Sequence, residues 1–240
     1  MILLKNLDDP RRRLLLQALA AGLFMQTLPA EEAQPSIFGK KPKRLPPGRS
    51  IYELKGEVKV NDVMATLETQ IEVNNTVETG PNSRIVFAVG DDVFLLRDGS
   101  KLIVSGRERG LVDILQCFAG KVLSVFGRRR HQIRTRTAIM GVRGSGVYFE
   151  ADPEETYFCT CYGVVDMRAS SDPTSKTTVT ATHHDEPKYI VANAAAGRRI
   201  RPAPFKDHTD EELMILEALV GRTVPFAFSS QDYGAPRRAY

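Results

Sequence analysis

The residues best suited to chemistry in this sequence are cysteines and histidines in its second half. Cys159 and Cys161 are separated by a single residue, in a stretch whose pattern predicts a β-strand. Side chains two positions apart on a strand point to the same side, so the two thiols are expected to face one way. His183 and His184 follow downstream, and His208 lies further along the chain.

Thiolates and imidazoles together are donors that suit zinc, copper or iron. An alternative hypothesis for this chain is therefore a metal- or haem-binding or redox protein built on Cys159, Cys161, His183 and His184, with His208 as an additional candidate ligand. Adjacent histidines point in opposite directions on an extended strand, so both could reach one ion only from a bend. The sequence does not choose between zinc, copper and iron.

Two other interpretations of the cysteines remain open. The spacing of Cys159 and Cys161 is not the Cys-x-x-Cys spacing of common zinc sites, and no second such pair is present. In an oxidising compartment, Cys117 would form a disulfide with one of the two and leave an odd thiol. Buried cysteines that serve only in packing are also common.

Hydrolytic chemistry has little support in the sequence. It contains no Gly-x-Ser-x-Gly elbow, phosphate-binding loop or His-Glu-x-x-His motif. Ser145, between two glycines, is a candidate nucleophile, but its base would have to be His131, His183 or His184, and no pattern favours one of them. We therefore expect a protein without enzymatic activity.

The elements that position these residues are mainly β-strands. From Ile51 onward, apolar residues alternate with polar ones, and turn residues separate the runs. Asp98-Gly99-Ser100 between two such runs is a strong hairpin signal. The pattern predicts one all-β domain over residues 51–200, made of many short antiparallel strands in a sandwich, a roll or a solenoid-like stack.

A single helix is expected in the C-terminal segment, residues 201–240. Thr209 and Glu212 form a capping-box pattern, and an apolar stripe that includes Leu213 and Leu216 follows them. Gly221 is a suitable end for this helix. Its apolar stripe is expected to pack on the β-domain.

The N-terminus resembles an export signal. Arg11 and Arg12 precede an uncharged apolar run that is too short to span a bilayer comfortably, which is typical of a twin-arginine signal within residues 1–30. The alternative is a buried amphipathic helix. Residues 31–50 are rich in proline, lysine and arginine and predict an extended linker. We expect a periplasmic protein that is not integral to the membrane once processed.

Charge and aromatic content limit the partners. The net charge is +4, of which +2 lies within residues 1–30, so charge alone does not indicate nucleic acid binding. A basic ladder of Arg130, Gln132, Arg134 and Arg136 shares one strand face. The first interpretation of this ladder is a solvated face, and the second is a docking surface for an anionic polymer or lipid headgroup of the cell envelope. The ladder has none of the interleaved aromatic residues that binding of single-stranded nucleic acid would need.

A series of short motifs runs between Tyr52 and Arg168. They are Gly56-Glu57-Val58, Val77-Glu78-Thr79-Gly80, Asp98-Gly99-Ser100, Gly120-Lys121-Val122, the stretch from Thr137 to Ser145, and Val147-Tyr148-Phe149. Their order resembles the FecR domain family over about half of the chain. The chain departs from the family pattern at Arg136, where a proline is usual, and at Ser145, where a threonine is usual.

This resemblance implies a periplasmic all-β module that acts as a sensor or interaction domain, linked in some members to iron-responsive signalling, with an envelope protein as partner. Within the motif we expect Gly141, Gly144 and Gly146 to form a fixed turn between two strands. Arg143 is expected to organise that turn by donating hydrogen bonds to carbonyl groups or a buried carboxylate.

Overall fold

Fourteen strands and one helix make up the part of the chain that the computed structural model describes, residues 42–226. The predicted export signal at Arg11 and Arg12 lies outside these residues. The elements are β1 (Ile51–Lys55), β2 (Val58–Val60), β3 (Val63–Met64), β4 (Asn75–Thr79), β5 (Arg84–Val89), β6 (Asp92–Leu96), β7 (Lys101–Ser105), β8 (Ile114–Val125), β9 (Arg130–Arg134), β10 (Ala138–Ala151), β11 (Glu155–Ala169), β12 (Asp172–Ala181), β13 (Lys188–Val191), β14 (Ile200–Pro202) and α2 (Asp210–Leu219).

The predicted fold class is confirmed. All fourteen strands belong to one sheet, and neighbouring strands pair antiparallel with one exception, the parallel pair of β8 and β9. The single helix lies near the C-terminus, as expected, and begins with the predicted capping box of Thr209 and Glu212. Three strands are much longer than the sequence pattern suggested: β8 has 12 residues, β10 has 14 and β11 has 15.

These three long strands pass from one layer of a sandwich to the other. The first half of β8 pairs with β7 and its second half with β6. The first half of β10 pairs with β9 and its second half with β8. In β11 the order is reversed, because its first half pairs with β13 and its second half with β12. The pairing therefore defines two layers that share these strands.

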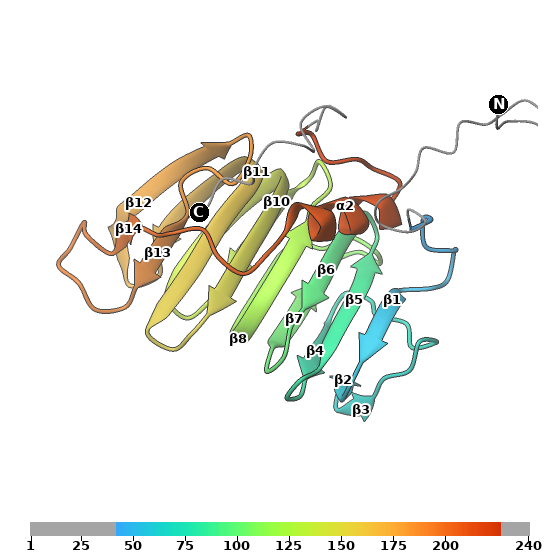
Figure 1. The fold of residues 1–240 in the computed structure, drawn as a ribbon. Helices are drawn as coiled ribbons and strands as arrows, with labels where there is room; N and C mark the ends of the chain where they lie inside the picture. Colours follow the sequence, from blue (N-terminus) through green and yellow to red (C-terminus); the bar gives the residue numbers. More distant parts are fainter. Residues whose placement is uncertain (1–41, 227–240) are drawn as a thin grey trace, which may run out of the picture. The chain divides into compact units, whose positions relative to one another are not determined.

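We call them the helix-covered layer and the opposite layer. The helix-covered layer contains β1, β5, β6, β13, β14, the second halves of β8 and β10 and the first half of β11; the opposite layer contains the remaining strands and half-strands. One apolar core fills the space between the layers. A second apolar cluster lies outside the helix-covered layer, where α2 packs across β6 and β8 (Figure 1).

The predicted glycine turn is not a turn between two strands. Residues Gly141 to Gly146 continue β10, and the change of layer is made by a bulge at which the register shifts between Arg143 and Gly146. Gly144 has φ +58° within this bulge, a conformation that glycine adopts at little cost. The sequence could not separate the two cases, since bulges and tight turns both select glycine.

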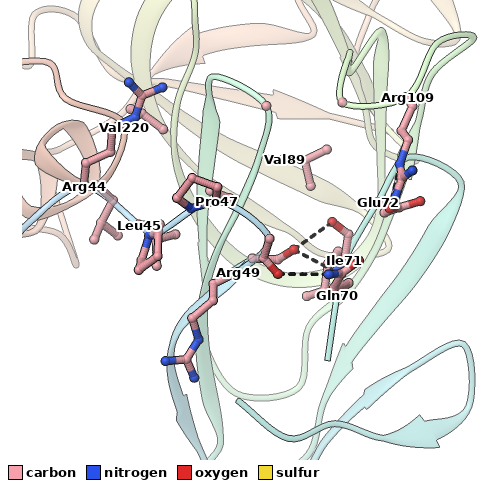
Figure 2. A pocket seen from close by; sticks show the side chains of 17 residues that line it. Arg44, Leu45, Pro47, Arg49, Gln70, Ile71, Glu72, Val89, Arg109 and Val220 are labelled. Atoms are coloured by element: carbon pink, nitrogen blue, oxygen red, sulfur yellow. Dashed lines mark hydrogen bonds and ion pairs between the residues drawn. The ribbon is translucent and has the colours of Figure 1, made fainter. Parts of the chain in front are cut away.

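The described part of the predicted linker, residues 42–50, packs on the domain. The Leu45 N–H donates to the Leu219 carbonyl at 3.0 Å, and the Leu45 side chain joins the apolar cluster under α2. The Ser50 hydroxyl binds the backbone of Ile71 and helps to form one wall of a pocket of about 330 Å³ (Figure 2). The proline and charge content of this segment predicted an extended linker and gave no sign of these contacts with the domain.

None of residues 42–226 forms a helix with the length and hydropathy needed to cross a membrane.

Candidate metal centre

Four of the five predicted metal ligands come together beneath α2. Cys159 and Cys161 lie on β11, on the face that points toward the helix, and Cys159 is paired in register with Tyr148 of β10. His184 lies in the turn that follows β12, and its N–H donates to the Cys161 carbonyl at 2.8 Å. His208 immediately precedes the N-cap of α2. One sulfur or nitrogen atom from each residue lies within 4.8 Å of those of the other three.

The distances between these donor atoms are short. Nε2 of His208 lies 3.0 Å from Nδ1 of His184 and 3.3 Å from Sγ of Cys161. Sγ of Cys159 lies 3.8 Å from Nδ1 of His184. A tetrahedral ion with ordinary zinc–nitrogen and zinc–sulfur bonds separates its ligand atoms by about 3.3 to 3.8 Å. The four donors therefore have nearly the spacing of a tetrahedral site.

In each of His184 and His208, the ring nitrogen that points away from the cluster makes a hydrogen bond, and this bond determines that the other nitrogen faces the cluster. Nε2 of His184 lies 2.7 Å from the Asp210 carboxylate, and Nδ1 of His208 lies 2.8 Å from the Lys206 carbonyl. Both partners only accept hydrogen bonds, so each outer nitrogen carries the proton. When the two rings are neutral, their inner nitrogens present lone pairs toward each other at 3.0 Å. A bound cation resolves this contact, and the two acceptors are typical outer-shell partners of metal-bound histidines.

The cluster is closed to solvent. Both cysteines are 0% exposed, His208 is 4% exposed and His184 is 8% exposed. Aromatic rings surround the imidazoles: Tyr148 stacks on His208 at a centroid distance of 4.6 Å, and Phe205 contacts both histidines. A site with four protein donors and no solvent access is typical of structural rather than catalytic zinc.

His183 does not join the four donors. Its ring lies half-buried on the outer side of Asp210, with Nε2 at 3.0 Å from both carboxylate oxygens. Its neighbour His184 has φ +53°, so the chain does bend here, but the bend directs only one of the two rings inward. His183, His184 and Asp210 form a second cluster of donor atoms that shares His184 with the first.

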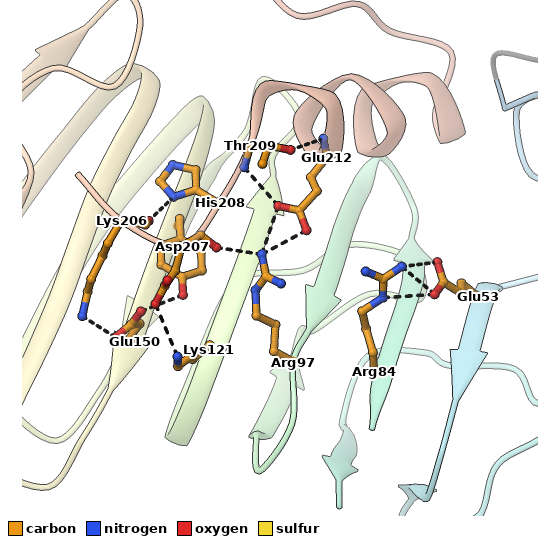
Figure 3. A network of polar contacts seen from close by, with 11 residues as sticks. Glu53, Arg84, Arg97, Lys121, Glu150, Lys206, Asp207, His208, Thr209 and Glu212 are labelled. Carbon is orange, nitrogen blue, oxygen red and sulfur yellow. Dashed lines mark hydrogen bonds and ion pairs between the residues drawn. The ribbon is translucent and has the colours of Figure 1, made fainter. Parts of the chain in front are cut away.

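A polar network holds the segment that carries His208 against the sheet (Figure 3). Lys206 contacts the buried carboxylate of Glu150 at 2.6 Å, and Lys121 contacts Asp207 at 3.4 Å. Arg97 donates to the Asp207 carbonyl at 2.7 Å and to the carboxylate of Glu212 at 3.0 Å. The residues on both sides of His208 are thus anchored to β8, to β10 and to Arg97, the residue after β6, which fixes the direction of its ring.

The cluster favours one thiolate before any ion binds. A hydrogen bond from Cys161 lowers the pKa of Cys159 to about 4, and hydrogen bonds from His184 and His208 act in the same direction against the effect of burial. Burial raises the pKa of Cys161 well above its ordinary value. Burial would lower the pKa of His184, but the hydrogen bonds to Asp210 and Cys159 outweigh it and raise that pKa to about 9.

The disulfide interpretation is wrong for this structure. Cys117, Cys159 and Cys161 are all free thiols. Cys117 lies in the core between the layers, and its thiol contacts the Ala119 carbonyl, whereas the other two cysteines lie outside the helix-covered layer. A strand of the sheet therefore separates the two groups.

Two other predicted features differ from expectation. Ser145, the candidate nucleophile, is buried, and its hydroxyl binds the backbone of Arg143 and Val164. It thus organises the β10 bulge, the role that was expected of Arg143. The Arg143 side chain is exposed and makes no hydrogen bond or ion pair with residues 42–226.

Two parts of the site were not predicted from the sequence. Asp210 has a sequence signal only as an acidic residue in the first turn of the expected helix, and the Lys206 carbonyl has none. The useful signal for Asp210 was its place two residues after His208, in the first turn of a helix that had to pack close to the cysteines.

Comparisons with known proteins leave the family open. No protein-family model matches the chain, and no curated protein matches it. Two crystal structures of a candidate anti-sigma factor from Parabacteroides distasonis are similar to it at 13% identity, with TM-scores of 0.43 and 0.44. The aligned regions cover 59% and 61% of this chain and 64% and 65% of those chains, so this chain spans less than two thirds of their length. The FecR resemblance stays a prediction from its motif residues.

Proposed function

We propose that this protein binds one zinc ion through Cys159, Cys161, His184 and His208. The observation that carries the proposal is the pair of inward-facing imidazole nitrogens, Nδ1 of His184 and Nε2 of His208, at 3.0 Å from each other and next to two thiols. Each outer nitrogen already donates to an acceptor, so both inner nitrogens point into the cluster, where a metal ion that displaces the proton of His184 would find two imidazole ligands.

Zinc suits this donor set better than copper or iron. Two thiolates and two imidazoles in a closed tetrahedral arrangement are a common set for structural zinc, which has no geometric preference of its own. Copper(II) prefers square or tetragonal sets, and the iron of non-haem oxygenases keeps open positions. The four donors here are buried on all sides, so no open position faces solvent.

The ion would join three parts of the chain that are distant in sequence. Its ligands come from β11, from the turn after β12 and from the residue before the N-cap of α2. Zinc would therefore fix the C-terminal segment, with the apolar residues Leu213, Leu216 and Leu219, on the helix-covered layer. The role that follows is structural, in an interaction module without enzymatic activity.

This role agrees with the sensor or interaction function that the FecR resemblance implies. We propose that the module works in the cell envelope with a protein partner and that docking of its C-terminal segment depends on the metal. The closed donor set supports a role without substrate turnover, because a substrate would need a free coordination position. Iron-responsive signalling is not part of the proposal.

Metal analysis tests the zinc site. Protein purified without chelators and then equilibrated with zinc should hold one equivalent after gel filtration, and cobalt should give the intense visible spectrum of a tetrahedral thiolate complex. Cys159→Ser and His208→Ala should each lose most of the bound metal. Cys117→Ser is the matched control, since that buried thiol lies in the other core, and it should keep one equivalent.

His183→Ala is a second control, because His183 lies outside the four-donor cluster. It should also keep one equivalent. Retention of less than a tenth of an equivalent by the unmodified protein, or equal loss in Cys117→Ser and Cys159→Ser, would contradict the zinc site.

A further inference from the structure

The opposite layer carries two arginines that face each other without a counter-charge. Arg130 of β9 and Arg143 of β10 are directly paired in the antiparallel register, so their side chains leave the same face of the sheet. Like charges in this position destabilise a strand pair. Neither arginine forms an ion pair with a carboxylate within residues 42–226. The fold therefore tolerates a repulsion that a single Glu at either position would remove.

A third arginine joins them at a pocket of about 760 Å³, a volume typical of small-ligand sites. The Gly144 N–H donates to the Gly127 carbonyl at 3.0 Å, which brings the start of the 128–130 segment next to the β10 bulge. Arg128 consequently lines the pocket together with Arg130 and Arg143. Gly141 also lines the pocket, and its missing side chain leaves space beside Gln132, its partner in register.

Arginines elsewhere on the described surface mostly have acidic partners. The ion pairs include Arg84 with Glu53, Arg97 with Glu212, Arg107 with Asp113, Arg109 with Glu72 and Arg201 with Glu155. Some other arginines, such as Arg134, Arg136 and Arg168, also have no ion pair among residues 42–226, but Arg128, Arg130 and Arg143 are unpaired and line the same pocket. An uncompensated cluster in a concave site indicates a place for an anion rather than an ordinary solvated face.

Neither of the two carboxylates at the pocket forms an ion pair with Arg128, Arg130 or Arg143. Asp113 is engaged by Arg107 and Arg129. Asp166 accepts a hydrogen bond from the Thr178 hydroxyl at 2.6 Å. Their negative charge does, however, disfavour a long polyanion lying across the pocket, so the site suits one compact anionic group.

We propose that this pocket binds a phosphate group through Arg130 and Arg143, with Arg128 as a third donor. Guanidinium groups present planar, paired N–H donors that match the oxygen atoms of a phosphate, and two of them on facing strands can contact different oxygens of one group. The amide of Gln132 supplies a neutral donor beside them. No Phe or Tyr residue lines the pocket, so it offers neither of these rings as a stacking platform for a nucleobase.

The phosphate site is independent of the zinc centre. Arg143 leaves the outer face of the opposite layer, whereas Tyr148, further along the same strand, belongs to the cluster under α2. Loss of zinc and loss of phosphate binding can therefore be observed separately.

Calorimetric titration of the intact protein with inorganic phosphate and with pyrophosphate, at physiological ionic strength, tests the site. We expect saturable binding of one equivalent. Arg130→Ala and Arg143→Ala should each weaken it by about tenfold or more, as expected for loss of a hydrogen bond between charged groups. Both side chains are exposed, so the variants should fold normally, which their unfolding midpoints will show.

Lys176→Ala is the matched control, because Lys176 lies on the same layer, opposite Arg168 and outside the pocket. It should change the affinity less than twofold. A second arm uses vesicles of phosphatidylcholine with and without phosphatidic acid, to distinguish a lipid headgroup from a soluble phosphoester. Binding only to phosphatidic acid vesicles, lost in Arg143→Ala, would identify the lipid source. Absence of binding in both arms, or equal weakening by Lys176→Ala, would refute the proposal.

Discussion

The Asp92 carboxylate lies 3.6 Å from Nε2 of His131, and both side chains are almost completely buried. His131 uses its other ring nitrogen to contact the Val112 carbonyl at 2.9 Å, and Asp92 accepts a hydrogen bond from the Gly127 N–H at 2.8 Å. Burial raises the pKa of Asp92 to about 7, and the Gly127 hydrogen bond reduces this effect only in part. Asp92 is therefore a buried acid that titrates near neutral pH.

Asp92→Asn should stabilise the protein above neutral pH. In the unfolded chain Asp92 loses its proton near its ordinary pKa of 3.8, whereas in the folded protein it keeps the proton until about pH 7. Between these values the folded state binds more protons, so this residue makes the free energy of unfolding fall as pH rises. The variant should be more stable than wild type by roughly 1 to 4 kcal/mol at pH 8, and by much less at pH 4.

Urea unfolding of both proteins across this pH range measures the difference. His131 acts in the opposite direction, because burial lowers its pKa, so the comparison with wild type is needed to isolate Asp92. The Asn side chain keeps an acceptor for the Gly127 N–H. A stability difference that does not grow with pH would show that Asp92 is already ionised in the folded protein at acid pH.

Asp210→Ala should weaken zinc binding without changing its stoichiometry. Asp210 accepts from Nε2 of His184 and touches none of the other three proposed ligands. Loss of such an outer partner typically reduces metal affinity by about 10- to 100-fold. Competition with a chromophoric chelator gives the affinity. Glu211→Ala removes the neighbouring acid of the same helix turn and should leave affinity within about twofold, since acids there contribute mainly to the helix dipole.

Two arginines in Figure 3 should differ in their contribution to stability. Arg97 reaches both the Asp207 carbonyl and Glu212, and the side chains of this ion pair are only 25% and 17% exposed. Arg84 binds Glu53 alone, and those side chains are 39% and 35% exposed. Arg97→Ala should lower the free energy of unfolding by about 1 to 3 kcal/mol, and Arg84→Ala by less than about 1 kcal/mol.

Denaturant unfolding of the two variants measures both values. Because Arg97 holds the segment that contains His208, its variant should also release zinc to a chelator faster than the Arg84 variant. If both variants lost the same amount of stability, the contacts of Arg97 with the C-terminal segment would contribute no more than an ordinary surface ion pair.

Lysines in place of Arg11 and Arg12 should leave precursor protein in the cytoplasm. The twin-arginine route recognises the paired guanidinium groups rather than positive charge alone, so charge-conserving variants are a specific test. Cell fractionation with an antibody against the folded domain measures the distribution. Lysine in place of Arg13 is the control, and normal export of the double variant would remove the twin-arginine route from consideration.

The local features of the fold were predictable because neighbouring residues determine them. The capping box at Thr209 occurs where the sequence places it, and Asp98-Gly99-Ser100 does form a turn between two strands. The hairpin prediction is wrong, because β6 pairs with β5 and β8 whereas β7 pairs with β4 and β8, so the turn joins the two layers. Alternation of apolar and polar residues likewise identified the strands. Strand β6 and the second half of β10 are buried on both faces and show no such alternation, but apolar runs between turn residues still indicated a strand at each place.

The transfer of strands between layers could not be predicted from local pattern. Gly163 has φ +94°, and a Cβ atom there would lie 2.2 Å from the Ser145 hydroxyl oxygen, so β10 and β11 must change layer together. The close contact between Gly163 and Ser145 joins residues on two different strands. The sequence shows only that glycines occur at both places, which suits a turn as well as a bulge.

The metal ligands were predictable as residue types but not as a set. Residues two positions apart on a strand face the same side, which predicts that Cys159 and Cys161 lie together, and the structure confirms this. Which histidine completes the set depends on the bend at His184 and on the path of the chain before α2, and both result from long-range packing. The sequence therefore indicates His183 as readily as His184, and it does not indicate the contact of Asp210 with His184.

The three long strands also determine how the domain should lose its structure. Each of β8, β10 and β11 contributes one half to each layer, so neither layer can detach while the other keeps its hydrogen bonds. Amide protons in both layers should then exchange with solvent through a single cooperative opening rather than through separate subdomains. A ligand held on either face would slow that opening for the whole sandwich, because it stabilises the only folded form from which opening begins.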